Sequence, residues 1–117
     1  MKSFLLLFLA IFSLSIAFAK PKPLYKHAVT VIFKTNVTAE QIAEVDNSFK
    51  SLKKLKVVKG YEWGVVDDKK AVKHVYIFSF EKPEDLKVYA ESPEHQAHIK
   101  VGAENVENVT AYQYFVK

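Results

Sequence analysis

The sequence contains no cysteine and no arginine, and it has little glycine or proline. Among its 117 residues there are only 3 glycines and 4 prolines. The absence of cysteine excludes a disulfide scaffold, a thiolate zinc finger, a cysteine nucleophile and a cysteine-linked lipid anchor. The scarcity of glycine and proline excludes a low-complexity or disordered chain. Hydrophobic residues make up 50% of the chain, which is enough for the core of one domain.

The 17 basic residues are therefore all lysines, and they are interspersed with 13 acidic residues. The formal net charge is only +4. Arginine's planar guanidinium is the side chain best suited to reading base edges and clamping phosphates. Its absence argues against a nucleic-acid partner. We interpret the lysines of residues 50–56 as the solvated end of a helix, where cations favour the helix dipole.

The first 19 residues have the pattern of a secretory signal peptide. Lys2 is the only charge before Lys20, an apolar run covers residues 4–16, and Ala17-Phe18-Ala19 has the small-x-small form of a cleavage site. The run is shorter than the roughly 20 residues of a bilayer-spanning helix. We therefore expect cleavage after residue 19, no stable membrane anchor afterwards, and a secreted or periplasmic protein. Residues 20–26 contain two prolines and are expected to form an extended lead-in.

Residues 27–117 form one continuous domain in this interpretation. The β-branched, alternating stretch 27–34 predicts a strand. Thr38 and Gln41 have the spacing of a capping box, which predicts the start of a helix. The apolar stripe of that helix consists of Ile42, Val45, Phe49 and Leu52.

The second half of the domain contains three more strands and a broken helix. Pro83 is predicted at the first position of a helix, and Ser92-Pro93 repeats the helix-start signal. The predicted strands lie within residues 57–66, 72–80 and 109–116, with a polar turn at 67–70.

The order β-α-β-β-α-β is the ferredoxin-like pattern, an α+β fold with helices covering one face of a four-stranded antiparallel sheet. Residue parity places His27, Val29, Val31 and Phe33 with His74, Tyr76, Phe78 and Phe80 on one face. The other face then carries Ile32, Val75, Ile77, Tyr112 and Tyr114. Both faces are substantially apolar, although two helices cover only one. We therefore expect a homodimer in which two sheets pack together into a closed α/β barrel.

At this level of detail, residues 27–116 resemble the stress-responsive A/B barrel (Dabb) domain, a dimeric α/β-barrel family. The matching stretches are Lys26-His27, Phe33-Lys34, Gly60-Tyr61-Glu62-Trp63-Gly64, His74 and Phe78-Ser79-Phe80-Glu81. The most specific stretch, residues 89–98, is similar to the family segment Tyr-x-x-His-Pro-x-His-x-x-Phe. Within it, Ser92 stands where a histidine is common, and His98 stands near the usual aromatic residue.

The resemblance implies candidate residues for function. The family includes plant polyketide-cyclising members and stress-induced proteins without assigned chemistry. In the cyclising members a tyrosine and a histidine of that segment act as an acid–base pair, and the matching positions here are Tyr89 and His95. Histidines on the strands line the same cavity, which corresponds to His27 and His74. We add Trp63 and Tyr76 as candidate pocket residues.

The residues alone leave alternatives open for the histidines. His27 and His74 either transfer protons and hydrogen-bond to a bound carbonyl, or they are neutral, buried and structural. His95 either acts as a base beside Tyr89 or packs at the helix break. His95 and His98 have a spacing at which two imidazoles could bind a metal, but no further ligand is fixed by spacing. We expect neither a metal nor a cofactor.

Three functional hypotheses follow. The chain binds a small apolar carbonyl or phenolic molecule between sheet and helices. Alternatively, it is an enzyme that uses the Tyr89–His95 pair, either as a polyketide-cyclase or isomerase or as a cofactor-free monooxygenase. In the third hypothesis it is a purely structural dimer. On strand residues 61–65, Tyr61 and Trp63 either stack on a ligand or pack in the core or dimer contact. An open cavity favours the first two hypotheses, and a cavity filled by aromatic side chains favours the third.

Overall fold

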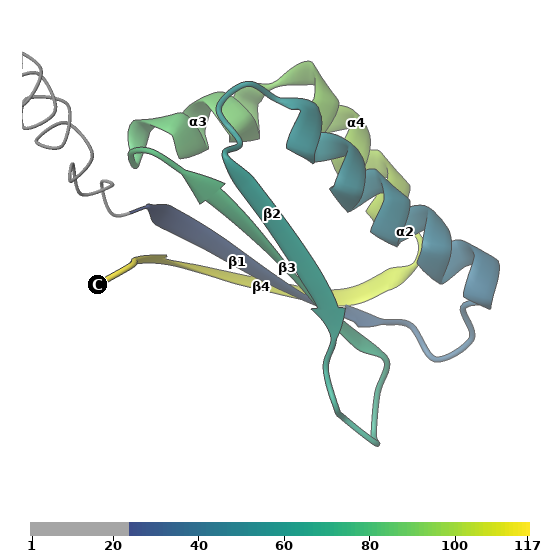
Figure 1. The fold of residues 1–117 in the computed structure, drawn as a ribbon. Coiled ribbons are helices and arrows are strands. Elements are labelled where there is room, and N and C mark those ends of the chain that lie inside the picture. The colour runs from purple at the N-terminus through teal and green to yellow at the C-terminus, as the bar shows by residue number, and fades with distance from the viewer. Residues whose placement is uncertain (1–23) are drawn as a thin grey trace, which may run out of the picture.

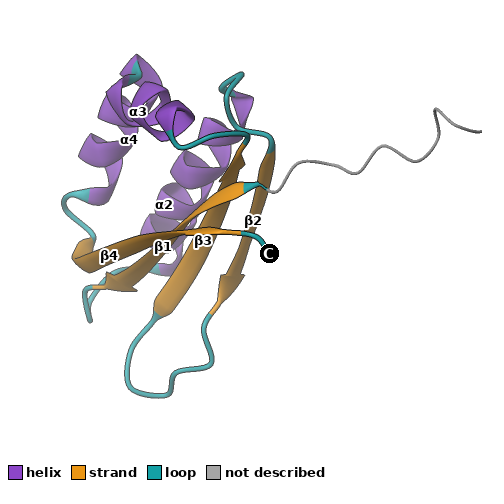
Figure 2. Cartoon of the chain, turned by 90° about the vertical axis from the view of Figure 1, so that its left-hand side faces the viewer, coloured by secondary structure: helices purple, strands orange, loops and turns teal. Residues whose placement is uncertain are grey.

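A computed structural model describes residues 24–117, which form a four-stranded antiparallel sheet with all helices on one face (Figure 1, Figure 2). The elements are β1 (Tyr25–Phe33), α2 (Ala39–Ser51), a 3-10 turn (Leu52–Lys54), β2 (Gly60–Val65), β3 (Lys73–Phe80), α3 (Glu84–Glu91), α4 (Pro93–Gly102) and β4 (Val106–Phe115). The strand order is β2-β3-β1-β4. The predicted ferredoxin-like α+β fold is confirmed.

The N-terminal predictions fall mostly outside the described part of the chain. The expected signal peptide, residues 1–19, lies wholly outside it, as do residues 20–23 of the expected lead-in. None of the helices within residues 24–117 has the length and hydropathy that a membrane crossing requires.

Helix α2 begins where its capping box predicts. The Thr38 hydroxyl accepts a hydrogen bond from the Gln41 backbone N–H at 3.1 Å, and the Gln41 side-chain oxygen accepts from the Thr38 N–H at 2.8 Å. Two amides that would otherwise lack partners at the helix start are thereby satisfied. Val45 and Phe49, from the predicted apolar stripe, are buried against the sheet.

The break between α3 and α4 is organised by Ser92. Its hydroxyl accepts from the His95 backbone N–H at 3.1 Å and donates to the Tyr89 carbonyl at 2.7 Å. One side chain therefore ends α3 and caps α4 at the break between the two helices. The start of α3 differs slightly from expectation, because Pro83 occupies the N-cap position rather than the first helical position.

Both outer limits of the sheet extend beyond the predicted strands. β1 begins two residues early because Tyr25 pairs with Phe80 on one side and Phe115 on the other. β4 begins three residues early, at Val106, which pairs with Phe33 after a shift of register. These partners come from distant parts of the chain, so local alternation does not reveal them.

The two faces of the sheet are those predicted from parity. The helix-covered face holds the buried core, which includes Val31, Phe33, Tyr76, Phe78 and Phe80. On the opposite face, cross-strand pairing places Ile77 beside Ala28, and Ala28 beside Tyr112. Tyr112 is 63% exposed there, so this face leaves large apolar side chains uncovered in the single chain.

Candidate functional site

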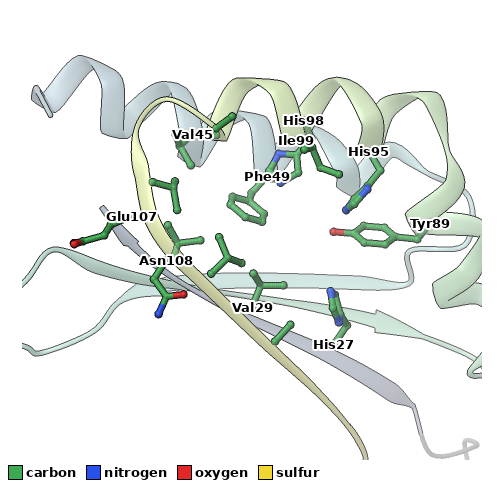
Figure 3. A pocket seen from close by; sticks show the side chains of 16 residues that line it. His27, Val29, Val45, Phe49, Tyr89, His95, His98, Ile99, Glu107 and Asn108 are labelled. Atoms are coloured by element: carbon green, nitrogen blue, oxygen red, sulfur yellow. The ribbon is translucent and has the colours of Figure 1, made fainter. Parts of the chain in front are cut away.

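A cavity of about 440 Å³ lies between the sheet and the helices, beneath α2 and α4 and above β1 and β4 (Figure 3). Its wall is mostly apolar, with side chains such as Val29, Val45, Phe49 and Ile99. The polar side chains on the wall are His27, Tyr89, His95, His98, Glu107 and Asn108. The cavity lies within the size range usual for small-molecule sites.

Tyr89 is the most deeply placed polar residue of the cavity. It is 1% exposed and packs against Phe78 and Phe80, with ring centroids 5.1 and 5.4 Å away. Figure 3 shows its hydroxyl directed into the cavity, between His95 and His27. Burial raises the pKa of the phenol well above its usual value. Tyr89 therefore stays protonated at neutral pH and serves as a hydrogen-bond donor or a weak acid.

His27 approaches Tyr89 from the sheet. The two ring centroids are 5.8 Å apart in an edge-on arrangement. The His27 Nδ1 lies 2.6 Å from the Gln113 side-chain oxygen. Because that oxygen can only accept a hydrogen bond, Nδ1 carries the proton and Nε2 is the unprotonated nitrogen of the neutral ring. Burial lowers the His27 pKa, and the bond to Gln113 offsets part of that effect. Gln113 on β4 thus fixes the tautomer of a histidine on β1.

His95 approaches Tyr89 from the opposite side, with ring centroids 4.9 Å apart. The helix break at Ser92 creates this contact, since the two residues belong to different helices. Burial lowers the His95 pKa, as does the nearby His27, while the Ala90 carbonyl acts in the opposite direction. Its Nδ1 is buried and has no hydrogen-bond partner among residues 24–117. A buried polar atom without a partner is uncommon in folded proteins.

His98 completes the polar wall and was not among the site residues predicted from sequence. Its ring lies 5.7 Å from that of His95, and its Nδ1 shares a 2.8 Å hydrogen bond with Ser48. Burial, followed by the neighbouring His95, lowers its pKa to about 4. The three-residue spacing of the two histidines was considered in the sequence analysis only for metal binding, although it also places both rings on one side of the helix.

Phe49 separates the cavity from a second polar group beneath α2. Its ring stacks on Tyr76 with centroids 3.7 Å apart and planes inclined by 12°. On the cavity side it packs edge-to-face with His98, and the two ring centroids are 4.1 Å apart. The same ring therefore forms a wall of the cavity and a cover for Tyr76.

That second group, the Asp46 cluster, consists of Asp46, His74 and Tyr76. Asp46 Oδ1 accepts from His74 Nδ1 at 2.7 Å and from the Tyr76 hydroxyl at 2.5 Å. Burial and the Asp46 carboxylate raise the pKa of Tyr76 strongly. Trp63 packs beside the cluster. Its ring centroid lies 5.7 Å from that of His74 and 6.2 Å from that of Tyr76, on which it stacks, and its side chain is 47% exposed.

The structure thus separates residues that the sequence analysis grouped together. Tyr89, His95 and His27 converge on the cavity, whereas His74, Tyr76 and Trp63 lie outside it, around Asp46. The expectation that His74 lines the same pocket as His27 is corrected. Both residues face the helices, but His74 is bonded to Asp46 on α2 and does not line the cavity.

The cavity has the groups for hydrogen bonding and proton transfer to a neutral molecule. A phenol O–H and neutral imidazoles can bind a carbonyl or hydroxyl group and move a proton to or from it. No lysine lines this cavity, and within residues 24–117 no group of three or more His, Cys, Asp or Glu residues has a metal-binding arrangement.

Comparison with known proteins adds a family to this geometry. Residues 25–116 match the family model described as "Stress responsive A/B Barrel Domain". No curated protein sequence matches the chain.

Solved structures with the same fold come from bacteria and plants. A dimeric ferredoxin-like protein of unknown function from Bacteroides fragilis is 28% identical, with a TM-score of 0.66 over 80% of this chain and 96% of that one. A Dabb family protein from Mesorhizobium loti is 17% identical, with a TM-score of 0.68 over 79% and 95%. A hydroxynitrile lyase from Passiflora edulis is 18% identical, with a TM-score of 0.73 over 83% and 96%.

Proposed function

Because the chain belongs to the stress responsive A/B barrel (Dabb) family, we propose that it binds a small, neutral carbonyl or phenolic compound in the cavity between sheet and helices. The observation that carries this proposal is the convergence of Tyr89, His27 and His95 on a mostly apolar cavity of about 440 Å³. A purely structural dimer has no need of such a space.

The wall carries no positive charge, and its one acidic side chain, Glu107, also disfavours an anionic ligand. Tyr89 stays protonated, and the lowered pKa values of His27, His95 and His98 keep these rings neutral at pH 7. No lysine on the wall compensates the charge of a carboxylate or phosphate, whose desolvation would then oppose binding. The phenol and imidazole groups instead match the donors and acceptors of a ketone or phenol.

The test is direct binding of 4-hydroxyacetophenone, measured by saturation-transfer NMR. Benzoate serves as the negatively charged comparison ligand. We expect the ketone to bind and benzoate not to bind. Tyr89→Phe should weaken binding about tenfold, since one hydrogen bond is lost. His74→Gln is the control outside the cavity and should leave affinity unchanged. Equal binding of benzoate, or an effect at His74 as large as that at Tyr89, would contradict the proposal.

Catalysis is the second candidate function, and the observation that favours it is the placement of the His95 and Tyr89 rings side by side on the cavity wall. In an enolisation, His95 would take a proton from the carbon next to a carbonyl while the Tyr89 O–H hydrogen-bonds to the carbonyl oxygen. Return of that proton to another carbon completes an isomerisation without any redox partner. Deuterium exchange into bound 4-hydroxyacetophenone at its methyl group, lost in His95→Gln, measures this step. Exchange at the same rate in the variant would refute the role of His95.

A homodimer is the proposed assembly. The uncovered sheet face carries Ile77 and Tyr112 among other apolar side chains, and two of the similar structures are described as dimeric. Sedimentation equilibrium should give twice the chain mass, and a monomer at micromolar concentration would refute the assembly.

Export is proposed from the signal-peptide pattern of residues 1–19. Expression of the full chain followed by N-terminal sequencing should show a mature protein that begins at Lys20. A retained Met1 in the folded protein would refute this.

A further inference from the structure

Five lysines follow one another closely where α2 ends and the chain crosses to β2 (Figure 1). This lysine patch consists of Lys50, Lys53, Lys54, Lys56 and Lys59, and all five side chains are exposed. No acidic residue occurs in the sequence between Asp46 and Glu62. The patch is therefore the most concentrated positive charge in a chain whose net charge is only +4.

The fold gathers three of these lysines around one hollow. Lys53, Lys54 and Lys59 line a surface depression of about 360 Å³, and its remaining wall contains no acidic side chain. Within residues 24–117, lysine ion pairs form elsewhere, at Lys73 with Asp68 and at Lys87 with Glu91, but none involves the patch. A helix end needs one or two cations to complement its dipole. Five lysines without acidic partners exceed that need.

We propose that the lysine patch binds the surface of an anionic phospholipid bilayer, with the hollow receiving a phosphate headgroup. None of its residues lines the cavity beneath α2 and α4, so this is a separate function from ligand binding. Clusters of four to eight basic residues of this kind are attracted to anionic bilayers. The patch adds no large exposed apolar side chain that would insert into the hydrocarbon, so binding is electrostatic and peripheral.

The chemistry of lysine favours a charged surface over capture of a single free phosphate. A lysine ammonium is a mobile point charge, whereas tight capture of one phosphate relies on the two-pronged geometry of arginine, which this sequence lacks. Five point charges spread along a helix end and a connection match an array of headgroups better than they match one anion.

The experiment measures partition of the full chain onto sedimented vesicles of phosphatidylcholine alone and of phosphatidylcholine mixed with phosphatidylglycerol. The readout is the ratio of the two partition coefficients, compared between variants, because residues 1–23 with Lys2, Lys20 and Lys22 are the same in every variant. The test variant is K53E/K54E/K59E. The matched control is K69E/K70E/K100E, which makes the same change of net charge at exposed lysines outside the patch.

We expect the wild-type protein to prefer phosphatidylglycerol vesicles and to lose that preference at high salt. Each lysine at an anionic surface contributes about fivefold, so the test variant should lose about 100-fold in the ratio and the control less than tenfold. The milder K53Q/K54Q/K59Q variant should fall between them. A wild-type ratio near one, or equal losses in test and control variants, would overturn the proposal. Full displacement from vesicles by inorganic pyrophosphate at matched ionic strength would overturn it in favour of a free phosphate site.

Discussion

Acidification should unfold this protein through His98, and the size of the effect can be worked from the structure. The side chain is 8% exposed, its Nδ1 is bonded to Ser48 and its ring edge contacts Phe49. Burial lowers its pKa from 6.5 to about 4. Protonation in the folded state would place a charge in this apolar layer.

The direction of the pH dependence follows from linkage. Because the folded-state pKa lies below that of the unfolded chain, the unfolded chain takes up more protons as the pH falls below 6.5. The contribution of His98 is therefore fully present above that pH and is lost as the pH falls toward 4. A difference of that size corresponds to about 3 kcal/mol by pH 4, a large share of a domain's stability.

Urea unfolding of the wild-type protein and of His98→Asn at pH 7 and pH 4 isolates this contribution. Asparagine keeps a polar group near Ser48 but cannot titrate, so the variant should be less stable at pH 7 and lose less stability on acidification. The difference between the two proteins should shift by about 3 kcal/mol in favour of the variant. Titration of carboxylates and of more distant histidines largely cancels in this comparison. Parallel pH profiles for the two proteins would show that His98 is not the origin of the acid sensitivity.

Three further predictions concern other contacts. Ser92→Ala removes the cap of α4 and the hydrogen bond to the Tyr89 carbonyl. The variant should lose about 1 kcal/mol of unfolding free energy in urea and exchange amide hydrogens faster at the start of α4. Unchanged exchange would contradict the role of Ser92 in joining α3 to α4. Asp46→Ala leaves the His74 N–H and a tyrosine hydroxyl without their acceptor and should lower the unfolding free energy by about 2–4 kcal/mol, whereas a loss under 1 kcal/mol would show that the cluster is not tightly packed. Ile77→Lys should produce a folded monomer in sedimentation equilibrium, because dimerisation would bury the new charge on the uncovered face, while Glu62 on the neighbouring strand can pair with it in the monomer. An intact dimer would show that another face mediates assembly.

Local sequence signals predicted the elements whose determinants are local. The capping box at Thr38 and the serine–proline pair at Ser92 placed two helix starts correctly, since their hydrogen-bond partners lie three residues away. Parity assigned the two sheet faces because successive strand residues alternate. The strand ends at Tyr25 and Val106 depend on partners elsewhere in the chain, and local patterns do not contain those partners.

The same distinction explains the outcome at the candidate site. Tyr89 and His95 are six residues apart, so a family resemblance and a helix break sufficed to bring them together. The position of His74 depends on Asp46, 28 residues earlier and on a helix whose rotation about its axis no strand pattern specifies. Parity showed that His74 faces the helices but not that it is bonded to Asp46 and excluded from the cavity.

The Phe49 ring serves both as a wall of the cavity and as the cover of Tyr76, and this double role limits how proteins with this fold can diverge. A family that takes up new ligands must change the volume of its cavity, and shortening the side chain at position 49 is the most direct way to enlarge it. Here that change would also remove the ring stacked on Tyr76 and expose the Asp46 cluster to the cavity. Selection for a larger ligand is therefore steered toward Ile99 and Val109 on the wall, which are not part of that cluster. Ligand range in such a lineage would change through α4 and β4 while α2 stays fixed.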